Sequence, residues 1–407
     1  MKNVVVVGAG ASGLMAAYAA ARNGNNVTVL EKNEKAGKKI YITGKGRCNV
    51  TNDVVPAEFL QNVVSNAKFL TSCIYTFPPA RLQELLESGG LRLKTERGNR
   101  VFPASDKASD VIKCLQKLCV DAGVEFRFHE NVTEIVKMQS TAFRIQCNTD
   151  EYFADAVIVC TGGESYPGTG STGDGYRIAE KFGHTVFARR AALCGIECDM
   201  GSGLSALQGL SLKNVRLSAE RNGKCIGSFF GEMLFTHFGI SGPIVLSLSS
   251  LLNKYDLREV RLAVDLKPAL DEQTLDRRLV REFDANKNKQ LQSVFAALLP
   301  KSLIVPVLVQ SGVSPVLPVN SVTKVDRTAI ANVLKSFALR PLALRPLSEA
   351  IVTAGGIDVR EITPKTMESK KVSGLYFCGE TLDVDAYTGG FNLQIAFSTG
   401  FAAGNAI

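Results

Sequence analysis

The sequence of 407 residues contains no tryptophan and only three histidines, and its ten cysteines include no C-x-x-C pair. The absence of indole rings removes one common stacking platform, and the cysteine and histidine spacings match no zinc-binding pattern. We therefore predict no metal site and interpret the cysteines as reduced thiols of a cytoplasmic protein. No apolar run approaches the roughly 18 to 20 residues that a membrane-spanning helix needs, so we predict a soluble protein with no membrane partner.

The charge of the chain is positive but dispersed. Lys and Arg total 47 against 39 Asp and Glu, a net charge of +8, and they form no basic run interleaved with aromatic residues. We therefore predict no nucleic-acid partner and attribute the charge to solvated faces and a small anionic ligand. The length and the 45% hydrophobic content predict two or three globular domains, and they leave the oligomeric state open.

The first 31 residues carry the pattern of a dinucleotide-binding unit. Val4–Val7 predicts a buried strand, a Gly-Ala-Gly-Ala-Ser-Gly turn follows it, and Leu14–Arg22 predicts a helix. A second apolar run ends in Glu31, where a carboxylate accepts hydrogen bonds from ribose hydroxyls. The same glycine spacing recurs at 168–173, but no strand directly precedes it, so we discount that second match.

Each glycine of the first turn has a mechanical role. Gly8 permits the tight bend, Gly10 lets the backbone approach a pyrophosphate, and Gly13 lets the helix pack on the strand. The free N–H groups at the helix N-terminus then face the phosphates.

The region after Glu31 indicates which dinucleotide binds. A classical dehydrogenase continues with further strand–helix repeats, whereas residues 32–52 are polar and glycine-spaced and predict a long loop. Four short runs then predict a β-meander, at 126–128, 132–138, 143–147 and 152–154. The next strand ends in Thr161-Gly162-Gly163. This arrangement favours FAD over NAD.

The C-terminal segment predicts the other half of the same site. Residues 374–380 predict a strand that ends in Gly379 and Glu380, and Glu380 or a nearby aspartate is a candidate to bind the ribityl chain. A final helix begins near Gly390, and its positive dipole would stabilise an anionic reduced flavin at N1 and O2.

Six motifs together strongly resemble one family of FAD oxidoreductases. They are residues 37–52, Arg100–Pro103, Thr161–Gly163 with Tyr166-Pro167, Phe235–Pro243, Thr353–Ile357 and Gly379–Gln394. The family is the bacterial NAD(P)/FAD-dependent oxidoreductase family that includes aminoacetone oxidase-like proteins and 3-dehydro-bile-acid Δ4,6-reductase, and the resemblance runs from residue 1 to the C-terminus. It implies an α/β fold in which a Rossmann-like FAD-binding domain, of the glutathione-reductase and fumarate-reductase kind, carries an inserted β-barrel and helical domain over the isoalloxazine face.

The domain boundaries follow from the positions where the glycine-lined elements stop and resume. We predict the FAD-binding domain at 1–189 and 349–407, and the inserted domain at 190–348, with a β-barrel part at 190–268 and 338–348 and a helical part at 269–337. Short strands separated by Asn-Gly turns indicate the β-barrel. Apolar residues at three and four spacing indicate the helices, and we expect Pro300 and Pro306 to break the middle of that part.

The motifs and the resemblance give a set of candidate cofactor-binding residues at strand ends, in the 32–52 loop and at the start of the last helix. They are Gly8, Gly10, Ala11, Ser12, Gly13, Glu31, Lys32, Lys39, Gly44, Gly46, Arg47, Cys48, Asn49, Val132, Thr161, Gly162, Gly163, Gly379, Glu380, Asp385, Gly390, Phe391, Asn392, Leu393 and Gln394. The stretch Lys45, Arg47 and Asn49 either clamps the pyrophosphate, lies against the flavin ring, or is an ordinary solvated loop. Cys48 has no partner at disulfide-reductase spacing, so we favour a packing role for it.

His237 and Tyr387 are the candidate catalytic residues. His237 lies in the insertion, where a loop that closed over the flavin would supply a proton donor near neutral pH, although a structural role is the alternative. Tyr387 precedes the glycines expected near the flavin and is a further proton-donor candidate.

These observations predict non-covalently bound FAD and hydride transfer between flavin N5 and a small organic substrate. The resemblance implies foremost an NAD(P)H-dependent reduction of a conjugated ketone, and oxidation of a small amine is the alternative. No separate NAD(P) fingerprint is visible, so NADH or NADPH would visit the flavin transiently as a co-substrate. A flavin-binding RNA-modifying protein, or a flavin-binding module without turnover, is an alternative of another class.

Overall fold

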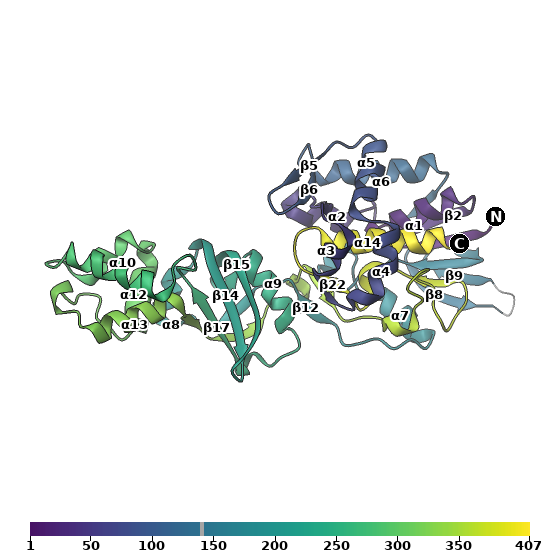
Figure 1. Ribbon diagram of the computed structural model, residues 1–407. Coiled ribbons are helices and arrows are strands. Elements are labelled where there is room, and N and C mark those ends of the chain that lie inside the picture. Colours follow the sequence, from purple (N-terminus) through teal and green to yellow (C-terminus); the bar gives the residue numbers. More distant parts are fainter. Residues whose placement is uncertain (139–141) are drawn as a thin grey trace. The chain divides into compact units, whose positions relative to one another are not determined.

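The computed structural model describes residues 1–138 and 142–407, which fold into two units (Figure 1). Unit 1 comprises Met1–Ala192 and Leu347–Ile407, and unit 2 comprises Leu193–Pro346. These boundaries lie within three residues of the predicted ones. Within the described ranges, every helix is too short or too polar to cross a membrane.

A five-stranded parallel sheet forms the core of unit 1. Its strands, in spatial order, are β21 (Leu375–Phe377), β11 (Ala156–Val159), β1 (Asn3–Val7), β2 (Asn26–Glu31) and β7 (Glu125–Phe128). Strand β1 occupies the middle because its four valines, each at most 5% exposed, can be covered on both faces. In its register, Val4 pairs with Val27 on one side and with Ala156 on the other. Since the carboxyl ends of parallel strands share one edge, the turns after these strands gather there.

Helices from opposite ends of the chain pack backbone to backbone in unit 1. Helix α1 (Ala11–Arg22) and helix α14 (Phe391–Asn405) run side by side (Figure 1). A Cβ atom added to Gly400 would lie 2.2 Å from the carbonyl oxygen of Ser12, and Gly404 is equally close to the backbone of α1. The N-terminal and C-terminal segments therefore share one interface that has no room for a further methyl group.

One strand of the predicted β-meander belongs elsewhere. Strands β8 (Val132–Lys137), β9 (Phe143–Cys147) and β10 (Glu151–Ala154) form the expected antiparallel sheet, but β7 pairs in parallel with β2. The prediction that residues 126–128 begin the meander is wrong. Because β7 is an edge strand, its side chains alternate between exposed and half-buried positions, which is the pattern of an antiparallel strand.

The other helices and strands of unit 1 are mostly short. They are α2 (Lys38–Ile42), β3 (Thr51–Asn52), α3 (Pro56–Leu60), β4 (Val63–Ser65), α4 (Ala67–Thr76), α5 (Pro79–Ser88), β5 (Leu93–Glu96), β6 (Arg100–Pro103), α6 (Ala108–Asp121), α7 (Asp174–Lys181), β12 (Arg190–Ala192), β20 (Val352–Ala354) and β22 (Asp385–Ala386). The chain leaves unit 1 after β12 and re-enters it before β20, and these two strands pair antiparallel. Residues 32–52, predicted as one loop, contain α2, which buried Ile40 anchors.

A seven-stranded antiparallel sheet forms the core of unit 2. Its strands, in spatial order, are β18 (Phe337–Leu339), β17 (Val260–Asp265), β14 (Ser211–Arg221), β15 (Lys224–Phe235), β16 (Gly239–Ser241), β13 (Ile196–Cys198) and β19 (Pro341–Leu344). Arg340 alone separates the two edge strands along the chain, whereas six strand spacings of about 4.8 Å would part them by roughly 29 Å in a flat sheet. The sheet therefore curls until its edges approach, which is the predicted barrel architecture.

Helices complete unit 2. They are α8 (Gly201–Leu204), α9 (Pro243–Leu252), α10 (Glu272–Asp284), α11 (Leu291–Val294), α12 (Lys301–Gln310) and α13 (Lys324–Lys335). Side chains cap two of them: Asp271 accepts a hydrogen bond from the backbone of Thr274 at 2.7 Å, and Thr323 and Asp326 form a capping box. The expectation that Pro306 breaks the chain is wrong, because this buried proline lies inside α12 and its neighbours hold the helix in the core. Helix α9 was not predicted.

A half-buried carboxylate in unit 1 depends on several donors. Glu361 accepts hydrogen bonds from the backbone N–H (2.9 Å) and the hydroxyl (3.0 Å) of Thr185, it pairs with Lys371, and its Oε2 lies 3.0 Å from Nδ1 of His184. Burial opposes the charge of Glu361, but these donors outweigh burial and lower the pKa to about 2. The ionised carboxylate is therefore part of what holds the fold.

Replacing Glu361 by glutamine is expected to reduce the acid sensitivity of the protein. With a pKa of about 2 in the folded chain and an ordinary value of 4.5, the ionised group stabilises the fold above pH 4.5, and this contribution disappears as the pH falls toward 2. Between about pH 7 and pH 3, the wild type should lose on the order of 2 kcal/mol more unfolding free energy than the variant. Urea unfolding at each pH measures this difference, and parallel curves for the two proteins would refute it.

Candidate cofactor site

The glycine turn after β1 leaves an open space at the edge of the parallel sheet. Gly8 has a φ of 100°, and its N–H donates to the carbonyl of Leu30 at 2.8 Å. A Cβ atom on Gly8 would lie 2.6 Å from the carbonyl oxygen of Cys160, and one on Gly13 would lie 1.9 Å from that of Gly8. A Cβ atom on Gly10 would meet no described atom within 4 Å. Two glycines of the motif are thus required by packing, and the third faces free space.

The first turn of α1 offers backbone donors to that space. Its first intrahelical hydrogen bond runs from the N–H of Leu14 to the carbonyl of Gly10 at 2.9 Å, and no side chain of the described residues caps the helix. The N–H groups of Ala11, Ser12 and Gly13 therefore have no partner within the helix, as at any helix N-terminus. Together with the helix dipole, they can bind a phosphate group.

Glu31 is buried at the end of β2, next to this turn. Its Oε2 accepts the N–H of Ala9 at 2.8 Å, and its Oε1 accepts the N–H and the side-chain amide of Asn33 at 2.9 and 2.6 Å. These bonds fix the carboxylate where the predicted ribose would lie. Lys32 points toward α7 instead, and its Nζ lies 2.6 Å from Asp174 and 2.7 Å from Thr172. Contacts of Glu31 and Lys32 with the cofactor stay predictions.

A half-buried ion pair joins the two ends of unit 1. Nζ of Lys39 lies 2.9 Å from Glu380 and 2.7 Å from the hydroxyl of Ser165. The other oxygen of Glu380 accepts the N–H of Thr353 at 2.7 Å and the Ser165 hydroxyl at 2.9 Å. Burial opposes the charge of Glu380, but Lys39 and these donors outweigh burial and lower the pKa. Both oxygens of Glu380 thus have protein donors, and its predicted ribityl contact stays a prediction.

The sequence did not single out Ser165 or Thr353. Both lie within motifs of the family resemblance, at 161–167 and 353–357, but neither carries a charge or a ligand-binding spacing. Their role follows from the network, because Thr353 also accepts hydrogen bonds from the backbone of Glu164 and Ser165 at 2.9 and 3.1 Å.

The loop over residues 43–49 is strained. Lys45 and Cys48 have positive φ angles of 58° and 59°, which side chains rarely adopt. The guanidinium of Arg47 lies 4.3 Å from the ring centre of Phe102 and pairs with Glu96 and Asp106. Arg47 is therefore held by the neighbouring hairpin, and a contact with the cofactor stays a prediction, as it does for Gly44 and Gly46.

Two neighbouring residues of this loop, Cys48 and Asn49, differ in whether a ligand could use their side chains. Burial raises the pKa of the Cys48 thiol to about 12, so it is neutral near neutral pH, as a packing residue would be. Oδ1 of Asn49 is buried and has no hydrogen-bond partner within residues 1–138 and 142–407. The same holds for the hydroxyl of Thr161, at the end of β11. Since buried polar atoms are normally paired, Asn49 and Thr161 indicate a missing ligand.

The start of α14 is built closely against the N-terminal half of unit 1. Gly390 has a φ of 96°, and a Cβ atom there would lie 2.4 Å from the carbonyl carbon of Thr51. The side chain of Asn392 bonds the N–H and the carbonyl of Ala386 at 3.0 and 2.8 Å. Gln394 is buried and accepts from the Thr51 hydroxyl at 2.6 Å, so its side chain holds the fold together.

Most of the remaining candidate cofactor-binding residues lie either between residues 379 and 391 or in the glycine pair at 162 and 163. The ring of Phe391 packs 5.2 Å from that of Phe59, Asp385 is buried in β22, and Gly379 would place a Cβ atom 2.8 Å from the Ser12 hydroxyl. A Cβ atom on Gly163 would lie 2.3 Å from the Thr353 hydroxyl, and Gly162 has a φ of 73°. Cofactor contacts of these residues, and of Leu393 and Val132, stay predictions.

A family model identifies the group to which this structure belongs. The model, described as HI0933-like protein Rossmann domain, matches residues 2–406. The chain belongs to the HI0933-like family.

Named relatives agree with this assignment. The ribosomal RNA dihydrouridine synthase of Haemophilus influenzae is 32% identical over 403 residues, which cover 98% of this chain and 96% of that protein. The 3-dehydro-bile acid delta(4,6)-reductase of Clostridium scindens is 31% identical over 416 residues, covering 100% and 99%. The solved structure of a 3-ketosteroid-delta4-(5alpha)-dehydrogenase from Rhodococcus jostii RHA1 has a TM-score of 0.56 at 16% identity, covering 100% of this chain and 96% of that one, and shows the shared fold.

As an HI0933-like protein, the chain is an FAD-dependent oxidoreductase. The predictions of the family, of the Rossmann-like α/β fold and of FAD are confirmed. The site fits the cofactor, because a Cβ atom on Gly10 would meet no described atom within 4 Å, no side chain of the described residues caps the N-terminus of α1, and buried polar atoms of Asn49 and Thr161 have no partner among those residues. These residues, with Glu31, would hold the dinucleotide.

The two candidate catalytic residues lie in different units. Tyr387 is half-buried in unit 1, and its N–H donates to the carbonyl of Asn62 at 3.0 Å. His237 is exposed in unit 2, and its ring centre lies 5.1 Å from that of Phe238. Both roles stay predictions. His184, to which we assigned no role, is buried beside Glu361 and is structural.

Proposed function

We propose that this HI0933-like protein reduces a carbon–carbon double bond conjugated to a carbonyl group, with NADH or NADPH as the hydride source. One observation carries the proposal: two relatives, each more than 30% identical over nearly the whole chain, have names that describe this reaction. A dihydrouridine is a uracil whose C5–C6 double bond, conjugated to the C4 carbonyl, has been reduced. A 3-dehydro Δ4,6-reductase acts on double bonds conjugated to a 3-ketone. The reaction is shared although the substrates differ.

In this reaction the double bond gains a hydride at one carbon and a proton at the other, while NAD(P)H becomes NAD(P)+. Bound FAD would supply the hydride from N5 of its reduced ring. The α1 N-terminus and Glu31 would orient the cofactor, and the N–H groups at the start of α14 would stabilise negative charge on the reduced ring. Tyr387 is the proton donor that unit 1 offers: burial raises the pKa of its phenol, and the charge of Asp385 raises it further, so the proton stays on the oxygen.

The test of the reaction is anaerobic mixing of the FAD-loaded protein with NADH, NADPH or aminoacetone. We expect NADH or NADPH to bleach the visible band of oxidised flavin, and a 3-oxo-Δ4,6-steroid or a uracil-containing RNA to restore it. Bleaching by aminoacetone alone would favour the amine oxidase instead. If none of the three bleached the band, the protein would be a flavin-binding module without turnover.

A uracil in ribosomal RNA is the second candidate substrate, alongside a small conjugated ketone. The Haemophilus influenzae relative favours it. The charge of unit 2 favours it too, because unit 2 contains 19 Lys and Arg and 13 Asp and Glu, which gives +6 of the net charge of +8 for the whole chain. This candidate and the expectation of no nucleic-acid partner exclude each other. Incubation with unmodified ribosomal RNA and NADPH decides between them, because uracil reduction adds two hydrogen atoms that mass spectrometry of the nucleosides detects.

A further inference from the structure

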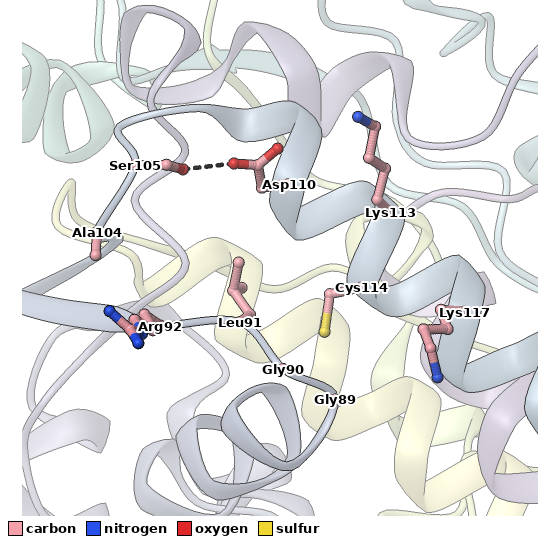
Figure 2. Close-up of a pocket in the computed structure, with 10 residues that line it drawn as sticks. All are labelled: Gly89, Gly90, Leu91, Arg92, Ala104, Ser105, Asp110, Lys113, Cys114 and Lys117. Atoms are coloured by element: carbon pink, nitrogen blue, oxygen red, sulfur yellow. Dashed lines mark hydrogen bonds between the residues drawn. The ribbon is translucent and has the colours of Figure 1, made fainter.

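A polar pocket lies in unit 1, and none of its lining residues belongs to the predicted cofactor set (Figure 2). It has a volume of about 400 Å³. The turn after α5 (residues 89–92), the two residues after β6 (104 and 105) and one face of α6 build its walls. A pocket of this size accepts a small ligand or one group of a larger ligand.

Two of the three cations that line the pocket have no carboxylate partner among the described residues. Arg92 and Lys113 are exposed on different walls (Figure 2), and neither forms an ion pair within the described part of the chain. Lys117 lies one turn further along α6 and pairs with Asp121. Among the lining residues, the one carboxylate is that of Asp110, which accepts the Ser105 hydroxyl at 2.6 Å. The side chains that line the pocket therefore carry three positive charges against one negative charge.

The floor and rim add no negative charge. Burial raises the pKa of the Cys114 thiol, which lines the floor, so the thiol is neutral near neutral pH. A Cβ atom on Gly89 would lie 2.7 Å from the sulfur of Cys114, so this glycine lets the end of α5 close against α6. Gly90 has a φ of 91°, and a Cβ atom there would meet no described atom within 4 Å. The rim at Gly90 is thus open to an incoming group.

The positive charge of unit 1 is concentrated in the segment that forms this pocket. Residues 89–121 contain seven Lys and Arg and four Asp and Glu, a net charge of +3. The rest of unit 1 contains 21 Lys and Arg and 22 Asp and Glu, a net charge of −1. A field of this kind attracts a polyanion over a Debye length of about 10 Å.

We propose that this pocket binds a phosphate group of the RNA backbone, and so docks the RNA outside the reaction site. The inference rests on the second candidate substrate named above. The fork of an arginine guanidinium matches two phosphate oxygens, and the Lys113 ammonium supplies a second charge from α6. A phosphate in the pocket would give Arg92 and Lys113 the anionic partner that neither has among the described residues.

The test is the salt dependence of RNA binding by a double variant, Arg92→Ala with Lys113→Ala. The probe is a fluorescein-labelled single-stranded oligouridylate, and its anisotropy gives Kd between about 50 and 200 mM KCl. Each phosphate contact to a single strand contributes about 0.7 to the slope of log Kd against log salt, so the loss of two contacts should lower the slope by about 1.4. We expect Kd at the lowest salt to rise about tenfold or more.

A matched control removes the same charges elsewhere in unit 1. Arg22 and Lys68 are exposed and form no ion pair among the described residues, so Arg22→Ala with Lys68→Ala should leave the slope near that of the wild type. Equal slopes for the two double variants, or a pocket variant that binds RNA like the wild type, would overturn the proposal. Titration calorimetry with inorganic phosphate tests whether free phosphate, and not the RNA backbone, is the ligand of the pocket. If the pocket variant loses phosphate binding but keeps RNA binding, the pocket takes free phosphate and the docking proposal is wrong.

The binding assay is independent of turnover, so the two proposals can fail separately. RNA binding that depends on the pocket without reduction of uracil would remove the second candidate substrate and leave the docking site in place. If the protein reduced uracil but the pocket variant bound RNA like the wild type, the docking site would be wrong and the second candidate substrate would stand. A wild type that did not bind RNA would remove both.

Discussion

A Gly10→Ala variant is expected to keep its fold and to bind FAD at least about tenfold more weakly, a loss of about 1.4 kcal/mol or more. A methyl group at this position meets no described atom within 4 Å, and the φ of −80° suits alanine. The methyl group would instead occupy the space in front of the α1 N-terminus, where the pyrophosphate must approach the backbone. Equilibrium titration of the apoprotein, followed by flavin fluorescence, measures the change.

Thermal unfolding of the apoprotein is the control for that variant. An ordinary surface substitution changes the free energy of unfolding by about 0.5 kcal/mol or less. The unfolding temperature of Gly10→Ala should therefore stay close to that of the wild type. Unchanged FAD affinity would mean that the cofactor does not approach the backbone at Gly10, and the assignment of this turn would be wrong.

A Gly400→Ala variant is expected to show the opposite behaviour, with the fold weakened before cofactor is added. Its Cβ atom would lie 2.2 Å from the backbone oxygen of Ser12, and the three nearest atoms all belong to the Ser12 backbone, so no side chain can move aside to make room. Separating α14 from α1 should cost about 3 kcal/mol and lower the unfolding temperature by roughly 10 °C. Differential scanning calorimetry of the apoprotein measures this.

The matched substitution for that experiment is Gly168→Ala. Gly168 would place a Cβ atom in open space and does not have a positive φ, so its unfolding temperature should stay near that of the wild type. If Gly400→Ala unfolded at the same temperature as Gly168→Ala, the first and last helices would not share the tight interface described above.

The parallel core was predictable because its signals are local. Within the first 22 residues, four successive valines predict a strand, the glycines predict a turn and the alanine-rich run predicts a helix. The structure contains all three. Strand β7 was misassigned for the converse reason: its alternating pattern reflects its place at the sheet edge, which a local pattern does not reveal.

The polar network of the site could not have been read from the sequence. Lys39 and Glu380 lie 341 residues apart along the chain, and neither position carries a signal that selects the other. Arg47 illustrates the same limit, since nothing in the sequence indicated that it pairs with Glu96 at the end of β5 and with Asp106 three residues after β6.

The distribution of charge needed the fold as well. Along the chain the basic residues look dispersed, and on that basis we expected no nucleic-acid partner. The division into two units shows a net charge of +6 on unit 2, and one pocket is lined by both Arg92 and Lys113, which lie 21 residues apart along the chain. Spatial grouping of this kind is invisible to a search for basic runs.

We propose that the N-terminal turn and the C-terminal helix of unit 1 hold one FAD molecule. The decisive experiment is titration of the full-length apoprotein with FAD, monitored by flavin fluorescence. We expect saturable binding of one FAD per chain. A chain that remains colourless after purification and gives no saturable change on titration would contradict it.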